Sequence, residues 1–249
     1  MITGNSNILT SLTMATNTGI GVDITGSTNS LSSSTITSPT SFGVQVVAGT
    51  GNTISATTVD GATGAGVRLE SASNNLSGGT VMNTISGPGV LVTAGAGNTI
   101  DATTIRSNAA IGVSITGGTG TIIQYARIAA NTGDGVDIAA AATGSLLKVN
   151  TINGNTGIGV DIAANTTTLY NNTVSHNTGA GVSIGAAVTG FDLRNNMFTN
   201  NGAAGINAPA GGTIDYNNTY GNVPSGTCVG GCALGANAYI RPQPPRIAG

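Results

Sequence analysis

The chain has 249 residues, of which only 6% are charged, with a formal net charge of −2 and an isoelectric point near 5.0. Phosphate backbones are bound by clustered Lys and Arg side chains, and the sequence has no such cluster, so we expect no nucleic-acid partner. It also has no apolar run of the roughly 18 residues that a membrane helix needs, so we expect no membrane insertion.

A short unit, Gly followed by apolar, variable and apolar residues, returns every 22 to 24 residues. Repeats of this length are typical of solenoids, in which each coil packs only on its neighbours. The unit begins at Gly21, Gly43, Gly66, Gly89, Gly112, Gly135, Gly159, Gly181 and Gly205.

Each period contains two further apolar positions. The first is occupied by Leu31, Ile54, Leu76, Ile100, Ile123, Leu147, Leu169, Leu193 and Ile214. The second is occupied by Ile36, Val59, Val81, Ile105, Ile128, Ile152, Val174, Phe198 and Tyr220. Alternating spacing and abundant Val, Ile and Thr favour short strands over helices.

Three strands per period predict an all-β protein, a right-handed single-stranded parallel β-helix (solenoid) of about ten coils with three short strands in each coil. We place the β-helix in residues 1–222. Residues 223–249 lose the apolar rhythm and contain several prolines, which cannot donate to a sheet ladder, so we expect an irregular C-terminal cap or tail there.

Asparagines recur at fixed offsets from the apolar positions. One set precedes the Gly by four residues, at Asn108, Asn131, Asn155, Asn177 and Asn201. Two others flank the first apolar position, at Asn29, Asn52, Asn74 and Asn98 and at Asn150, Asn172, Asn196 and Asn217. Identical amides one strand apart form ladders, so we expect these side chains to be structural.

Units such as Asn172–Ile184 resemble the parallel β-helix repeat of the pectin-lyase-like superfamily, over roughly residues 7–222. The resemblance implies this fold. It does not select an activity, because that superfamily contains pectate lyases, polygalacturonases, alginate epimerases and phage tailspikes beside adhesins without catalysis.

Two outward-facing groups are candidate sites. Asp137 and Asp161 occupy the same position in adjacent coils, with Asp134 beside them, so these carboxylates are candidates for an acid and base pair or a weak Ca²⁺ site. The polygalacturonases of this superfamily also use a cluster of Asp residues, but their other motifs are absent from this sequence. Lys148, Tyr170 and Arg194 share another position in successive coils and are candidates for binding an acidic sugar.

Cys228 and Cys232 are separated by Val-Gly-Gly and are the chain's two cysteines, which favours a small disulfide in an oxidising compartment, with free thiols as the alternative. A zinc site would need further Cys or His ligands, and the sequence has a single His, so we expect no metal centre of this kind.

The turns are short: the longest connection from the Gly to the first apolar position exceeds the shortest by three residues, and the chain has no Trp. We therefore expect no deep cleft and favour a structural or adhesive β-solenoid at a bacterial surface or secreted from the cell, with other copies of itself or a polysaccharide as partner. The alternative is a lyase or hydrolase that acts on acidic polysaccharides.

Overall fold

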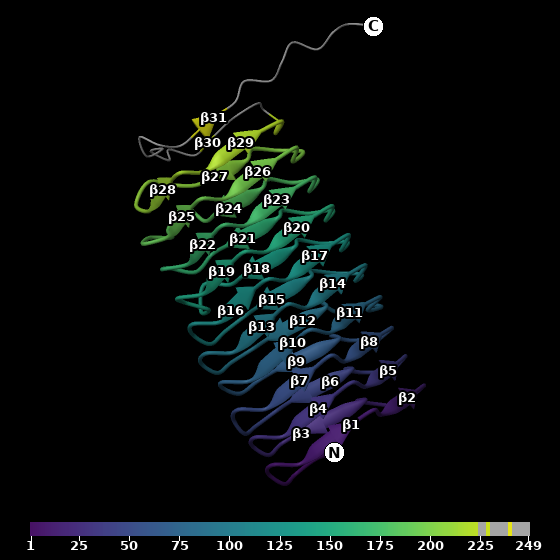
Figure 1. The fold of residues 1–249 in the computed structure, drawn as a ribbon. Helices are drawn as coiled ribbons and strands as arrows, with labels where there is room; N and C mark the ends of the chain where they lie inside the picture. Colours follow the sequence, from purple (N-terminus) through teal and green to yellow (C-terminus); the bar gives the residue numbers. More distant parts are fainter. Residues whose placement is uncertain (224–227, 230–238, 241–249) are drawn as a thin grey trace, which may run out of the picture.

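The computed structural model describes residues 1–223, 228–229 and 239–240. The chain winds as a right-handed solenoid with three strands in each coil and no helix in the described residues, which confirms the predicted architecture. Figure 1 shows the coils stacked from the N-terminal to the C-terminal end, so that equivalent strands of successive coils form three long parallel sheets.

Apart from β30, sheet A contains the strands that follow the Gly of each repeat unit. The first and last residues of its three-residue strands point inward. Val136 and Val160, for example, are fully buried. Its strands are β3 (Val22–Ile24), β6 (Val44–Val46), β9 (Val67–Leu69), β12 (Val90–Val92), β15 (Val113–Ile115), β18 (Val136–Ile138), β21 (Val160–Ile162), β24 (Val182–Ile184), β27 (Ile206–Asn207) and β30 (Cys228–Val229).

Sheet B directs only the middle residue of each strand inward, the first of the two further apolar positions. Its strands are β1 (Ile8–Thr10), β4 (Ser30–Ser32), β7 (Thr53–Ser55), β10 (Asn75–Ser77), β13 (Thr99–Asp101), β16 (Ile122–Gln124), β19 (Leu146–Lys148), β22 (Thr168–Tyr170), β25 (Asp192–Arg194) and β28 (Thr213–Asp215).

Sheet C follows sheet B after a two-residue turn, and the middle residue of each of its three-residue strands points inward. Its strands are β2 (Thr13–Ala15), β5 (Thr35–Thr37), β8 (Thr58–Asp60), β11 (Thr80–Met82), β14 (Thr104–Arg106), β17 (Arg127–Ala129), β20 (Thr151–Asn153), β23 (Thr173–Ser175), β26 (Met197–Thr199), β29 (Asn218–Tyr220) and β31 (Tyr239–Ile240).

The last full coil differs from the expected register by one residue. Phe198 pairs with Thr219, which is buried, whereas Tyr220 points outward, so the inward assignment of Tyr220 was wrong. Asn217 holds the preceding turn at two residues, because its Oδ1 accepts hydrogen bonds from the backbone N–H and Nδ2 of Asn196 at 2.9 and 3.0 Å. The turn geometry therefore overrides the apolar preference of the tyrosine.

The chain continues into two of the sheets beyond residue 222. β30 pairs with β27 in sheet A, and β31 pairs with β29 in sheet C. Cys228 packs partly buried against the core and is disulfide-bonded. Cys232, its expected partner, lies outside the described residues, as does most of the segment 223–249, so the pairing and the irregular tail stay predictions.

The asparagines form buried ladders at all three corners of the coil, as expected. In the ladder between sheets C and A, Asn155 Oδ1 accepts from the backbone N–H of Asn131 at 3.0 Å and from its Nδ2 at 2.9 Å. Asn155 repeats this pattern with Asn177 in the next coil, at 3.0 and 2.9 Å. Each amide thus satisfies a corner N–H that no strand ladder reaches.

We predict that Asn155→Ala lowers the free energy of unfolding by about 3 kcal/mol, because two buried donors of Asn131 lose their acceptor at about 1–3 kcal/mol each. Urea denaturation followed by circular dichroism measures this. The control is Asn153→Thr, an outward position on β20, which we expect to change stability by less than about 0.5 kcal/mol. Equal midpoints for the two variants would show that the ladder contributes little.

Candidate functional site

The middle residues of the sheet A strands point outward and line up along the solenoid. Five of them form one polar line, which we call the sheet A row: Ser114, Asp137, Asp161, Ser183 and Asn207. They are direct Cα partners on the neighbouring strands β15, β18, β21, β24 and β27. Parallel strands lie about 4.8 Å apart, so each side chain is within contact distance of the next.

Asp137 and Asp161, the acidic pair, are adjacent in this row and half-buried. Burial raises the pKa of Asp137 most, with further increases from the negative charges of Asp161 and Asp134. Burial and the charge of Asp134 raise the pKa of Asp161. Hydrogen bonds with the neighbouring serines, Ser114 and Ser183, oppose these shifts in part. The predicted carboxylate cluster is therefore present, and both members resist ionisation.

Asp134 lies two residues before β18, at a position that is apolar in every other coil of the repeat. Its Oδ1 accepts a hydrogen bond of 2.6 Å from the backbone N–H of Ile158, which fixes the carboxylate beside the acidic pair. The equivalent residues are Ile20, Phe42, Ala65, Pro88, Ile111, Ile158, Ala180 and Ala204. This departure from the repeat singles out the coil of Asp137.

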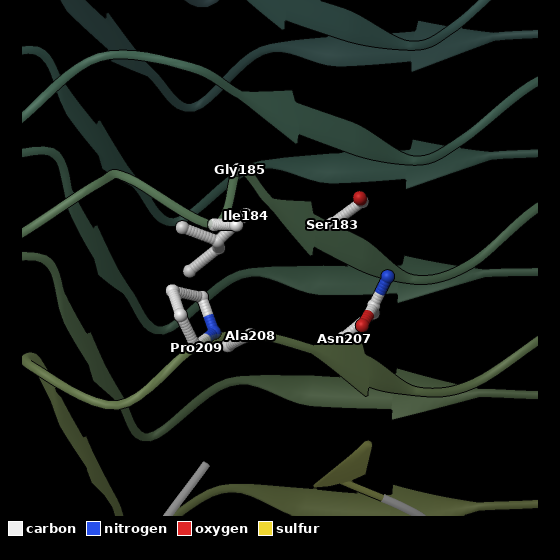
Figure 2. Close-up of a pocket in the computed structure, with 7 residues that line it drawn as sticks. Ser183, Ile184, Gly185, Asn207, Ala208 and Pro209 are labelled. Carbon is white, nitrogen blue, oxygen red and sulfur yellow. The ribbon is translucent and has the colours of Figure 1, made fainter. Parts of the chain in front are cut away.

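A surface pocket of about 320 Å³ adjoins the C-terminal end of the sheet A row. Figure 2 shows Ser183 and Asn207 projecting from neighbouring strands, with Gly185 and Pro209 in the connections that follow. Sequence reasoning expected no deep cleft and did not identify this hollow. The signals available were the long connection after β24 and the proline in the connection after β27.

The described residues contain no group of three or more His, Cys, Asp or Glu side chains placed to hold a metal ion. The three Asp residues are thus neighbours along the surface without converging on one point. A weak Ca²⁺ site at the acidic pair stays a prediction.

The expected row of Lys148, Tyr170 and Arg194 is present. It lies on sheet B, whereas the acidic pair lies on sheet A. Their strands β19, β22 and β25 pair in register. Asp192 connects two of the three, because its Oδ2 accepts from the Tyr170 hydroxyl at 2.8 Å and its Oδ1 lies 2.8 Å from Arg194 Nε. The hydrogen bond to Asp192 is the main reason why the pKa of Tyr170 is raised. The two predicted groups therefore occupy different faces and do not form one site.

The described part of the chain has no helix that is long and apolar enough to cross a membrane. A family model for the right-handed β-helix region matches residues 1–101 and 88–241. No curated protein sequence matches the chain.

Several solved structures share the fold. A mutant of the periplasmic alginate epimerase AlgG is 15% identical, with a TM-score of 0.75 over 87% of this chain and 61% of its own. The A-module of mannuronan C-5 epimerase AlgE6 from Azotobacter vinelandii is 17% identical, with a TM-score of 0.61 over 79% of this chain and 57% of its own.

The enzymatically active domain of tailspike protein 2 from bacteriophage CBA120 is 11% identical, with a TM-score of 0.64 over 87% of this chain and 38% of its own. The chain thus spans less than two thirds of each of these three structures. At such low identities the similarity establishes the fold.

We predict that Asp134→Asn lowers the pKa of both Asp137 and Asp161, because it removes a repelling charge and keeps an oxygen acceptor for Ile158 N–H. Both values should stay above the ordinary 3.8, since burial is the larger cause. Carboxyl carbon chemical shifts followed by NMR through a pH titration measure this. Asp60→Asn, on sheet C, is the control and should leave both pKa values unchanged; a similar shift there would contradict the assignment.

We also predict that Asp137→Asn stabilises the fold at neutral pH. The folded pKa of Asp137 is raised, so its favourable contribution is complete below 3.8, the ordinary value, and is lost as the pH rises through the folded pKa. Thermal melts at acidic and neutral pH should therefore separate the variant from wild type only at neutral pH. A stability gain of equal size at both pH values would point to a cause other than ionisation.

Proposed function

The chain belongs to the right-handed β-helix family, and we propose that it hydrolyses a polysaccharide at the acidic pair. The observation that carries this proposal is the placement of two carboxyl groups with raised pKa values on adjacent strands, in a row whose next residue, Ser183, lines a surface pocket. Groups with perturbed pKa values beside a hollow are typical of acid and base catalysts.

The chemistry follows from the difference in protonation within the pair. Mutual repulsion means that the first carboxyl ionises more readily than the second, so one proton is shared by two groups over a range of pH. The protonated carboxyl donates its proton to the glycosidic oxygen as the bond from that oxygen to the anomeric carbon breaks. The ionised carboxylate attacks the anomeric carbon, and water then releases the sugar and returns the proton.

The strand spacing favours this retaining course over the inverting one. Adjacent parallel strands are about 4.8 Å apart, which is close to the spacing of about 5 Å between the two carboxyl groups of retaining glycosidases. Asp134 supports the pair by raising both pKa values. Ser183 and Asn207 line the pocket and provide hydrogen-bonding groups for a sugar ring.

Elimination by a lyase fits this surface less well, because it requires a cation near the substrate carboxylate. Lys148 and Arg194 are on sheet B, and Arg106 and Arg127 are on sheet C. Arg68 belongs to sheet A, but its strand β9 lies three strands from β18, and it pairs with Glu70 at 3.2 Å. Hydrolysis therefore has the better support.

The structural neighbours favour polysaccharide activity over the spacer or adhesive role that the sequence suggested. These neighbours include alginate and mannuronan epimerases and an enzymatically active tailspike domain. The periplasmic and phage proteins among them also support export from the cell for this chain. Self-association stays a prediction from the sequence.

We predict that the protein releases reducing ends from at least one member of a panel of neutral and acidic polysaccharides. Asp137→Asn and Asp161→Asn should each lower this rate by at least about 100-fold, the usual contribution of a general acid or base. Asp60→Asn, on another face, serves as the control and should retain the rate. Products with an unsaturated terminal sugar, or full activity in both pair variants, would refute hydrolysis at this site.

A further inference from the structure

The corner between sheets B and C carries exposed aromatic side chains in the C-terminal half of the solenoid. Each turn there has two residues, of which the second is directed inward and the first has a positive φ. Tyr125 and Tyr216 occupy that first position with φ of 53° and 54°, and they are 57% and 56% exposed. Tyr170 lies one residue before the same turn, at the end of β22.

A large side chain at this turn position costs conformational energy. Residues with a side chain avoid the left-handed region, which Gly and Asn tolerate best. The other coils accordingly place mainly small or amide residues here: Ser11, Ser33, Ala56, Gly78, Ala102, Asn171 and Asn195. Tyr125 and Tyr216 gain little burial in return, so packing does not explain their presence. Strain without a structural gain is the kind of outlier that suggests function.

The three tyrosines recur at every second coil. Their strands β16, β22 and β28 alternate with β19 and β25 in sheet B, so the coils that carry them are separated by about 9.6 Å, two strand spacings, along the axis. This is close to the length of one disaccharide in an extended polysaccharide. The hydroxyl of Tyr170 donates to Asp192 Oδ2 at 2.8 Å, which holds its ring over the sheet. We call Tyr125, Tyr170 and Tyr216 the tyrosine ridge.

Positive charge lies in the coil of Tyr125, at Arg127, and in the coil between Tyr125 and Tyr170, at Lys148. Arg127 on β17 and Lys148 on β19 are the charged residues on the strands of sheets B and C in the coils of β16, β19 and β22. Neither forms a salt bridge within the described part of the chain. Arg194 pairs with Asp192 through Nε, which leaves its terminal amino groups for a ligand. Apart from Asp192, the acids on the described strands of sheets B and C are Asp60, three coils before Tyr125, Asp101, one coil before Tyr125, and Asp215, in the coil of Tyr216.

We infer that the tyrosine ridge binds an extended acidic polysaccharide. Sugar rings stack on Tyr125, Tyr170 and Tyr216, and a carboxylate between the first two stacked sugars contacts Arg127 and Lys148. This second binding surface goes beyond the proposed hydrolysis, because it lies on a face that the acidic pair does not share. It would hold a polymer on the enzyme while another segment reaches sheet A.

The test is gel retardation of the full chain in polygalacturonate, with hydroxyethyl cellulose as the neutral gel. All variants carry Asp137→Asn, so that cleavage does not disturb binding and a failure of the proposed hydrolysis is recorded separately. We expect retardation in polygalacturonate that weakens with added salt, and little in the neutral gel.

Tyr125→Asn and Tyr216→Asn should each weaken binding at least fivefold. Both should leave the melting temperature equal or higher, because Asn171 and Asn195 already occupy the same turn position in two other coils. Val149→Asn is the matched control: Val149 has φ of 58° at this position in the intervening coil, so the change relieves the same strain without removing a ring. Lys148→Gln should reduce the preference for the acidic gel.

Three results would overturn the inference. The protein could migrate unretarded in polygalacturonate, Val149→Asn could weaken binding as much as the tyrosine variants do, or the neutral gel could retard the protein equally. A fall in melting temperature for Tyr125→Asn and Tyr216→Asn, with binding unchanged, would instead show that the rings stabilise the fold.

Discussion

The buried amide ladders are the interaction on which the rest of the structure depends. A three-cornered coil has backbone N–H groups at its corners that the strand ladders do not satisfy, and burying them unpaired would cost about 1–3 kcal/mol each. An Asn at the corner accepts from the N–H and the Nδ2 of its equivalent in the preceding coil, as Asn196 and Asn217 show at 2.9 and 3.0 Å. The ladders thereby hold equivalent residues of successive coils in register.

Because successive coils are in strict register, side chains at the same position of each coil form a line along the molecule. On sheet A it sets Asp137 beside Asp161, where burial and like charge raise both pKa values. That arrangement disfavours the folded state at neutral pH and is tolerated because the inward residues of the same strands are fully buried. At the corner of sheets B and C, the same register places Tyr125 and Tyr216 at equivalent turn positions, and Tyr170 lies one residue before the turn in a coil midway between them. In both places, a regular and well-packed solenoid contains a locally unfavourable feature: two repelling carboxyl groups on sheet A and tyrosines with left-handed backbone conformations at the corner.

The three faces of the solenoid also keep acidic and basic side chains apart that the composition alone would allow to share one site. The chain has few charged residues, and Asp134, Asp137, Lys148, Asp161 and Arg194 all lie within residues 134–194. Asp137 and Asp161 are on sheet A, and Asp134 lies in the connection that leads into β18. Lys148 and Arg194 are on sheet B. A mechanism that pairs the cations with the acidic pair is therefore excluded by geometry. Hydrolysis at the pair and binding at the tyrosine ridge become two independent questions.

The sequence by itself determined the solenoid, its three strands per coil, the amide ladders and the inward residues of every coil except the last full one, where Thr219 takes the place expected for Tyr220. It could do so because each coil contacts only its neighbours, so a period of 22 to 24 residues carries most of the contact information. It also predicted that Asp137 and Asp161 are adjacent and that Lys148, Tyr170 and Arg194 form a row. These predictions needed only the repeat length and the alternation of side chains along a strand.

The tertiary structure decided what depends on turn geometry and on contacts around the coil. It placed Thr219 inside and Tyr220 outside, because the ladder at Asn217 holds a two-residue turn against the apolar pattern. It gave Tyr125 and Tyr216 left-handed conformations that no local propensity predicts, and it formed the pocket beside Ser183 and Asn207. Such features arise from the path of the chain between strands, where residue type constrains conformation less than the stacked coils do.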